Sequence, residues 1–244
     1  MYRRMVCAAA VMALGVAWSS PGQEPADSSA MVSADEDIAI VAEILRTISS
    51  DTVVPSGVTK TAGGRVVSLN LSNQVLGTAG LKQIPDRVFT LTGLQELYLS
   101  KNVLSALPFE LTELKKLRVL DVGDNEISEV PSWIGDLQNL ERLDLRNNEF
   151  SDLPASLYTL KKLKYLQMWG NDLSTLSDDI SKLTSLEELY LERNRLKSLP
   201  VTITKMKALK YLDYGYNYLC NLPPAVHEWM VKKDKKYKSL QKCW

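Results

Sequence analysis

The sequence predicts an α/β solenoid, a stack of short strand-and-turn units, and two observations lead to it. Asparagine recurs at a constant spacing of 23 residues, and the same frame of leucines surrounds each copy; in the fourth unit Leu140, Leu143 and Leu145 precede Asn148. The recurring residues are Asn102, Asn125, Asn148, Asn171, Asn194 and Asn217. Each unit can bury its apolar side only against its neighbours, so the units must stack.

The first half of each unit is predicted to be a short strand. Leucines at positions four and six alternate with polar residues, which is the pattern of a strand with one buried face. Corresponding strands are expected side by side, about 4.8 Å apart. An early unit begins at Val66 and contains about five extra residues within Gln74–Gly80. The others begin at Leu94, Leu117, Leu140, Leu163, Leu186 and Leu209.

The second half of each unit is predicted to return through a short helical turn. A Leu-Pro or Val-Pro pair follows most of the asparagines, and proline fits the start of such a turn. The fifth unit carries Ser177 in place of proline, and its hydroxyl can cap the turn. The asparagine amide is expected below the surface, bonded to backbone groups of neighbouring turns. Its loss should cost about 1–3 kcal/mol.

This frame resembles the leucine-rich repeat family, in the 23-residue form with Leu-Pro after the asparagine loop, over residues 65 to about 231. The resemblance implies a curved α/β solenoid with parallel strands on the concave face and short helical turns on the convex side. It implies no cofactor and no catalytic residues. Members of this type include intracellular scaffolds of small GTPase signalling and exported bacterial surface or host-interaction proteins. The start of the chain favours the exported bacterial group.

That start has the features of a secretory signal peptide. Arg3 and Arg4 precede an apolar run, Val6–Trp18, which is short for a spanning helix of about 20 residues. Cleavage is expected after Ser19 or Gly22. We therefore expect a secreted, periplasmic or cell-surface protein with no membrane insertion after cleavage.

Four segments are expected along the chain. Their bounds are 1–22 for the signal peptide, 23–64 for a disordered leader and helical N-terminal cap, 65–231 for the solenoid of about seven units, and 232–244 for a basic tail. The cap helix is expected over Asp35–Ile48, with acidic residues in its first turn. Its apolar face is expected to consist of Ile38, Val41, Ile44, Leu45 and Ile48.

Two cysteines remain after removal of the signal peptide, Cys220 and Cys243. An even number in an exported chain suggests a disulfide, which would close a loop of about 23 residues and could add roughly 3 kcal/mol. Two unpaired thiols are the alternative, since spacing alone does not bring the Cα atoms together.

Composition and motifs argue against several functions. Lys plus Arg equals Asp plus Glu, at 29 each, so no overall field indicates nucleic acid. The N-terminal region is acidic and the tail basic, which suggests weak head-to-tail self-association or simply solvated caps. The chain has one histidine, His227, and no nucleophile, phosphate-loop, zinc or dinucleotide motif. We expect neither an enzyme nor a metal or other cofactor.

Function is therefore expected on the outward strand positions. Aromatic and arginine residues gather there in the C-terminal half, and these types dominate protein–protein hot spots. The predicted partner-binding residues are Arg142, Arg146, Tyr165, Trp169, Tyr190, Glu192, Arg193, Tyr211 and Tyr216. The alternative is that tyrosines only tile an exposed sheet, because aromatics favour strands.

The function predicted from these observations is a non-enzymatic protein-binding module that recognises a partner on its concave face. A structural, self-assembling envelope protein is a second interpretation. An intracellular scaffold of the small GTPase type is a third, if the N-terminus is not cleaved. A peptide or glycan could also occupy an aromatic groove of this kind.

Overall fold

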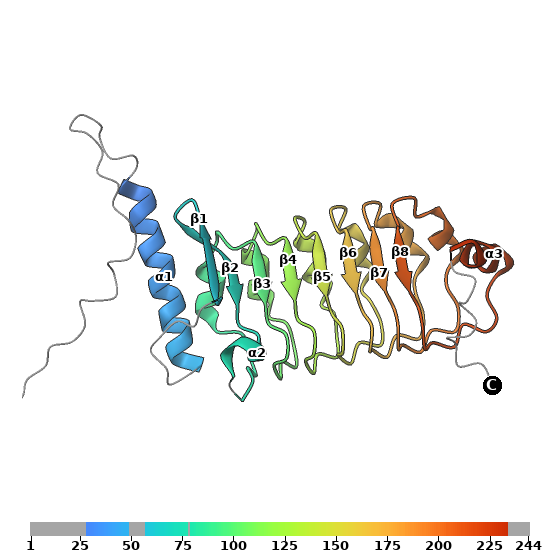
Figure 1. Ribbon diagram of the computed structural model, residues 1–244, viewed down its shortest axis with the longest axis horizontal. Helices are drawn as coiled ribbons and strands as arrows, with labels where there is room; N and C mark the ends of the chain where they lie inside the picture. Colours follow the sequence, from blue (N-terminus) through green and yellow to red (C-terminus); the bar gives the residue numbers. More distant parts are fainter. Residues whose placement is uncertain (1–27, 49–56, 78, 234–244) are drawn as a thin grey trace, which may run out of the picture.

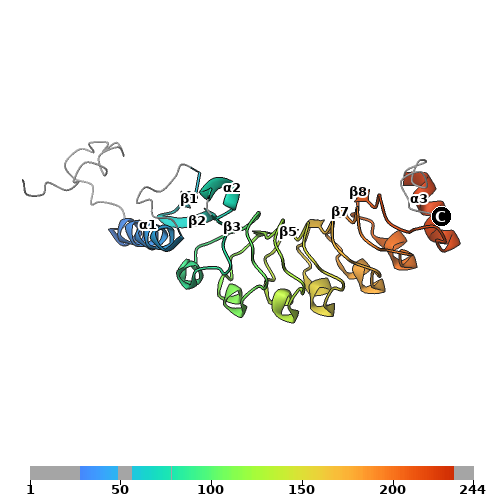
Figure 2. The same ribbon diagram turned by 90° about the horizontal axis from the view of Figure 1, so that it is seen from below.

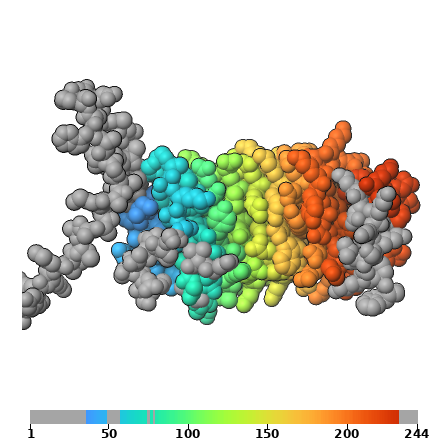
Figure 3. All heavy atoms as spheres, in the orientation of Figure 1, coloured from blue at the N-terminus to red at the C-terminus, as the bar shows by residue number. Residues whose placement is uncertain are grey.

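A computed structural model describes residues 28–48, 57–77 and 79–233 of the chain. The predicted signal peptide, Cys243 and most of the basic tail lie outside these residues. Along the long axis the units stack in chain order (Figures 1 and 3). The strands line one side and the helical turns the other, and the row bends gently with the strands on its inner side (Figure 2). The predicted curved solenoid is confirmed.

The described strands form one sheet in the order β1 to β8. Strand β1 pairs antiparallel with β2, and all later pairs are parallel. The strands are β1 Thr59–Ala62, β2 Arg65–Asn70, β3 Glu96–Tyr98, β4 Val119–Asp121, β5 Arg142–Asp144, β6 Tyr165–Gln167, β7 Glu188–Tyr190 and β8 Tyr211–Asp213. The α-helices of the described residues are α1 Ser28–Ile48, α2 Asn73–Leu76 and α3 Pro224–Lys233.

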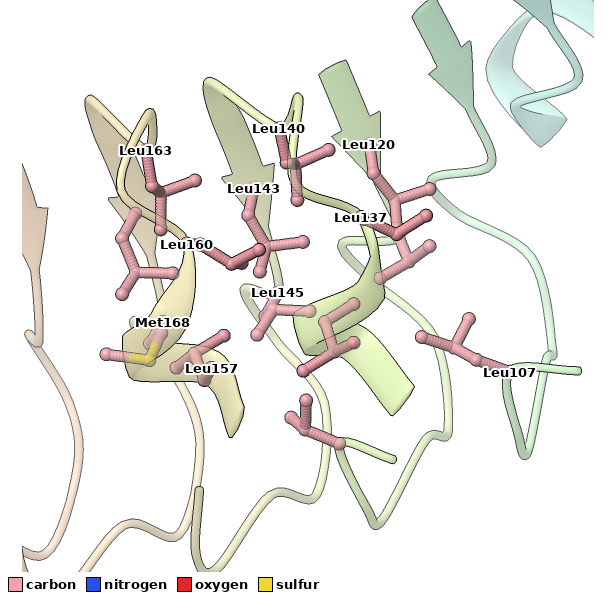
Figure 4. Packing of buried hydrophobic residues seen from close by; sticks show 14 of the residues in the cluster. Leu107, Leu120, Leu137, Leu140, Leu143, Leu145, Leu157, Leu160, Leu163 and Met168 are labelled. Atoms are coloured by element: carbon pink, nitrogen blue, oxygen red, sulfur yellow. The ribbon is translucent and has the colours of Figure 1, made fainter. Parts of the chain in front are cut away.

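Pairing follows the 23-residue register without a slip. Leu143 of β5 pairs with Leu166 of β6, and Leu166 with Leu189 of β7. These leucines are fully buried, and their strand neighbours belong to the opposite face of the sheet. Figure 4 shows the leucines of adjacent units packed into one another. Because side chains alternate along a strand, this register fixes which residues face out.

Short 3₁₀ turns form the convex side, each with a proline or Ser177 at its N-cap. They span Asp86–Thr90, Phe109–Glu113, Ser132–Asp136, Ala155–Thr159, Asp178–Lys182 and Val201–Lys205. Ser177 Oγ accepts a hydrogen bond from Asp179 N at 3.2 Å, as expected of a capping serine. The Tyr158 hydroxyl also bonds the Ser177 backbone, and burial raises the pKa of that phenol to about 12. A proline at this position would have no N–H to offer it.

The asparagines form a continuous internal ladder. Asn148 Oδ1 accepts from Ile127 N at 3.0 Å, and its Nδ2 donates to Val122 O at 3.0 Å and Leu145 O at 3.2 Å. The same pattern recurs one unit on, where Asn171 accepts from Phe150 N. The predicted structural role of these side chains is confirmed.

The N-terminal cap differs in three respects from the expectation. Helix α1 starts at Ser28, so part of the expected disordered leader is helical, since neither proline nor glycine interrupts the sequence from there to Ile48. Its first turn holds no acidic residue. Ile38 is 40% exposed, because Asp37 occupies the buried position beside it and accepts bonds from Arg65 Nε and Val66 N. The rest of the apolar face packs inward as expected.

The hairpin that β1 forms with β2 was not predicted from the sequence. Gly63 and Gly64 both have positive φ, 55° and 71°, and connect Ala62 to its partner Arg65. Two consecutive left-handed residues are what a tight two-residue hairpin turn requires. The single-turn helix α2 overlaps the start of the predicted insertion, and the left-handed Gly77 caps its C-terminus.

At the other end of the array, α3 covers the last unit with Val226 and Met230, both buried. Among the described residues, no helix has the length and apolar character to cross a membrane.

Candidate functional site

Three tyrosines stack across the concave face of the last three strands. The rings of Tyr165 and Tyr190 have centroids 5.1 Å apart, and those of Tyr190 and Tyr211 are 5.0 Å apart. Interplanar angles of 45° and 43° make both contacts tilted. Register explains the stack, because Tyr165, Glu188 and Tyr211 pair along one row and Tyr190 stands one outward position further along β7. We call these three residues the tyrosine ladder.

An arginine closes one end of the ladder. The Arg142 guanidinium carbon lies 3.7 Å from the centroid of the Tyr165 ring. This distance is well within the range of a cation–π contact. The opposite end is open, since Tyr211 is 48% exposed.

The middle ring is held by a carboxylate. Tyr190 Oη donates to Glu188 Oε2 at 2.7 Å. Burial, followed by this hydrogen bond, holds the pKa of Tyr190 well above its usual range. The hydrogen bond to Glu188 orients the phenol.

The side chain of Gln167 connects the ladder to Trp169. With its amide turned to satisfy its neighbours, Gln167 donates to the Tyr165 hydroxyl and to Asp144 Oδ2 at 3.1 Å, and accepts from Trp169 Nε1. Trp169 is half-buried. At position seven of its unit, Trp169 thus has its indole beside the ladder rather than in the core.

Arg146 belongs to a different cluster. Its Nη1 lies 2.5 Å from Asp144 Oδ2 and its Nε lies 3.2 Å from Asp124 Oδ2. The side chain crosses Gly123, where an added Cβ would come within 2.8 Å of Arg146 Cγ. Asp144 is buried, and burial together with the nearby Asp121 raises its pKa to about 6. Arg146 is therefore engaged in ion pairs with Asp144 and Asp124 of its own chain.

The rim at position eight holds a second aromatic contact. The Arg193 guanidinium carbon lies 5.7 Å from the Tyr216 ring centroid, and Arg193 Nε is 3.5 Å from Glu192 Oε1. Arg193 and Tyr216 both have positive φ, 52° and 54°, so the rim repeats one left-handed turn. Tyr216 is 45% exposed beside an open hollow of about 370 Å³.

The structure therefore sorts the nine predicted residues into three groups on β5–β8. Arg142, Tyr165, Tyr190 and Tyr211 form one stack, with Trp169 attached through Gln167. Glu192, Arg193 and Tyr216 form the rim group. Arg146 is turned into ion pairs.

Three neighbours were absent from the predicted set: Asp144, Gln167 and Glu188. Their signal was present, because they stand in the same register rows as the residues that were chosen. Cys220 is exposed, and its predicted partner Cys243 lies outside the described residues, so the disulfide stays a prediction. Within the described residues, no group of three or more His, Cys, Asp and Glu side chains is placed to hold a metal ion.

Two family models match the repeats. One described as a leucine-rich repeat region matches residues 110–193, and one described as leucine rich repeat matches residues 65–127. A search of curated proteins found no match.

Solved structures with this architecture include a leucine-rich repeat protein of Leptospira interrogans, 32% identical with a TM-score of 0.62 over 67% of this chain. The ectodomain of the Arabidopsis thaliana receptor kinase GASSHO1/SCHENGEN3, in complex with CASPARIAN STRIP INTEGRITY FACTOR 2, is 31% identical with a TM-score of 0.54 over 59%. Pollen Receptor Kinase 3 is 25% identical with a TM-score of 0.59 over 76%. The chain spans 40% of the first protein, 18% of the second and 95% of the third.

Proposed function

The chain belongs to the leucine-rich repeat family, and we propose that it is a non-enzymatic module that binds a partner protein on the concave face of β5–β8. The observation that carries the proposal is the tyrosine ladder, a stack of aromatic rings on an outward face that the repeat frame does not require. Its open end, Tyr211, and the rim residue Tyr216 are both nearly half exposed.

Uneven distribution of aromatic residues supports binding over simple tiling. The outward positions three and five of β3 and β4 hold one aromatic residue, Tyr98, beside Glu96, Val119 and Asp121. The same positions of β6 to β8 hold three tyrosines, with Trp169 and Tyr216 beyond them. Tyrosine, tryptophan and arginine are enriched among the few residues that dominate binding energy at protein interfaces. A partner is therefore expected to contact the C-terminal half of the face.

A non-enzymatic role agrees with the chemistry of this surface. Burial raises the pKa of Asp144 on this surface, and such shifts often mark a catalytic acid or base. Here the carboxylate is buried and bonded to Arg146, so it serves an internal contact instead. The Arabidopsis receptor-kinase ectodomain, solved in complex with CASPARIAN STRIP INTEGRITY FACTOR 2, is a precedent for a repeat array of this kind as a receptor.

We also propose that the chain is exported and bacterial, with residues 1–22 removed as a signal peptide. The Leptospira interrogans relative, at 32% identity, supports the bacterial assignment. The remaining segments are proposed to be the leader and N-terminal cap at 23–64, the solenoid at 65–231 and the basic tail at 232–244. Cys220 and Cys243 are proposed to pair across the end of the last unit. Non-reducing peptide mapping of the exported chain would test the pairing.

Crosslinked capture from the native setting tests the binding proposal. The exported chain is incubated with surface and secreted proteins, beside a Tyr211→Ala/Trp169→Ala variant. The control is Phe109→Ala, which removes an aromatic side chain that is 61% exposed on a convex-side turn. Unfolding temperatures of all three are compared, so that a misfolded variant is recognised.

The expected result is a partner captured by the wild type and by Phe109→Ala and lost by the concave-face variant. Equal capture by all three would refute this site. Recovery of the chain itself and nothing else would favour the self-assembling alternative.

A further inference from the structure

We infer that the part of the partner held by the tyrosine ladder is an extended, arginine-containing cationic segment. The inference rests on the proposed function and adds the chemistry of the ligand. It follows from the open end of the ladder, from the charge around it, and from the state of the arginines already on the face.

The ladder already binds one guanidinium. Arg142 covers Tyr165 at one end, at 3.7 Å from the ring centroid. Tyr211 at the other end has the same kind of ring, exposed, and no cation of the described residues lies over it. The internal contact shows that the ring face at the end of the ladder accepts a planar cation. An incoming arginine would repeat at Tyr211 what Arg142 does at Tyr165.

The charge around the open end is negative. The outward positions of β7 and β8 and of the residues that follow β7 carry the carboxylates of Glu188, Glu192 and Asp213 against one guanidinium, that of Arg193. Arg193 is already beside Glu192 at 3.5 Å. Within the described part of the chain, neither Glu188 nor Asp213 makes an ion pair; they accept bonds from Tyr190 Oη and Gly215 N. Charge complementarity therefore favours a cationic ligand.

Two of the arginines on the face already have carboxylate partners. Arg146 is held by Asp144 and Asp124, and Arg193 lies beside Glu192. An acidic segment would meet carboxylates at the open end and would have to compete with these ion pairs. The same surface is more favourable for arginine than for lysine, because a guanidinium stacks on a ring face and an ammonium is more strongly hydrated.

The dimensions suit an extended chain. Two inter-strand steps, from β6 to β8, cover about 10 Å, which about three residues of extended backbone span. A basic side chain at every second position would then reach the ladder from one side of the segment.

The test measures binding of three fluorescent peptides of equal length to the full exported chain, by anisotropy. Their repeats are Arg-Gly, Lys-Gly and Glu-Gly. We expect the Arg-Gly peptide to bind most tightly, the Lys-Gly peptide at least about twofold more weakly, and the Glu-Gly peptide not to bind. Binding should weaken with added salt. Equal binding of the arginine and glutamate peptides would overturn the inference.

Matched variants separate ring stacking from bulk. Tyr211→Phe keeps the ring and should retain the Arg-Gly peptide, whereas Tyr211→Leu should weaken it about two- to fivefold or more. Asp213→Asn, which keeps an acceptor for Gly215 N, should also weaken it. The control is Tyr98→Leu, a concave-face tyrosine on β3 outside the ladder. If Tyr211→Leu binds like the wild type, or if Tyr98→Leu is equally impaired, the ladder is not the site.

Competition distinguishes this inference from the proposed function. A captured partner that depends on Tyr211 and is displaced by the Arg-Gly peptide supports both. A partner that depends on Tyr211 but is not displaced overturns the cationic chemistry and leaves the binding site standing. Self-association of the chain that Tyr211→Leu abolishes would show a second copy to be the occupant and would overturn the inference.

Discussion

Replacement of Asn148 by alanine tests the internal ladder on which the solenoid depends. The asparagine amide makes four hydrogen bonds to backbone groups: it accepts from Ile127 N and donates to the carbonyls of Val122, Leu145 and Arg146. It is 8% exposed. Alanine removes all four bonds at a buried position.

The structure shows how much of this loss is compensated. Each carbonyl keeps another donor: Val122 O accepts from Asn125 Nδ2, Leu145 O from Asn171 Nδ2, and Arg146 O from Asp124 N. The uncompensated group is the Ile127 N–H. Leaving one buried donor unsatisfied costs about 1–3 kcal/mol, and the shared carbonyl bonds add to it. We therefore expect Asn148→Ala to lower the free energy of unfolding by about 2–3 kcal/mol.

Urea unfolding followed by circular dichroism measures that loss, and hydrogen exchange locates it. The Ile127 amide should exchange faster in Asn148→Ala, while amides two units away keep their protection. The control is Asn147→Gly, which changes the neighbouring asparagine at a left-handed position that glycine tolerates. A loss below about 0.5 kcal/mol, or unchanged exchange at Ile127, would refute the assigned role.

Three further predictions concern stability. The pKa of Asp144 is raised to about 6, so this carboxyl stabilises the fold fully below about pH 4, and that contribution is lost as pH rises through 6. The resulting decline in the free energy of unfolding is at most about 3 kcal/mol. Asp144→Asn should abolish the decline when unfolding is measured from pH 4 to 7. Ser177→Pro should destabilise the wild type by about 1 kcal/mol but be tolerated in Tyr158→Phe, which has no hydroxyl to satisfy. A double-mutant cycle measured by thermal unfolding that shows no coupling between the two positions would contradict this. Gly170→Ala, at φ +71° and with its Cβ overlapping Asn147 Oδ1, should cost about 2 kcal/mol in urea unfolding, and a neutral result would contradict the strain.

The repeats could be predicted in detail because their spacing is constant. Once Asn125 and Asn148 set the register, the outward rows follow from alternation along a strand, and the structure pairs Tyr165, Glu188 and Tyr211 as the rows require. The inward leucines and the capping role of Ser177 follow from the same frame.

The ends could not be predicted with the same accuracy, because no repeat fixes them. The Gly63-Gly64 pair is a hairpin signal, but β1 has few apolar residues and most of it is exposed. Ile38 fitted an apolar helical face, yet the buried place beside it belongs to Asp37, whose carboxylate satisfies Val66 N at the start of β2. Such contacts depend on the tertiary fit of the cap.

Within the site, the sequence predicted which residues lie beside one another but not which contacts their side chains make. Arg142 and Arg146 look alike in the pattern, yet one lies on an aromatic ring and the other is tied to two aspartates. Which of them is occupied depends on Gly123, whose missing side chain leaves room for Arg146.

Hydrogen exchange of the exported chain with and without its captured partner tests the central claim most directly. Binding on the concave face should slow exchange in peptides covering 165–170, 188–193 and 211–216 and leave the convex turns at 109–113 and 132–136 unchanged. Protection of the convex turns, or of the N-terminal strands alone, would contradict the assignment of the tyrosine ladder as the binding surface.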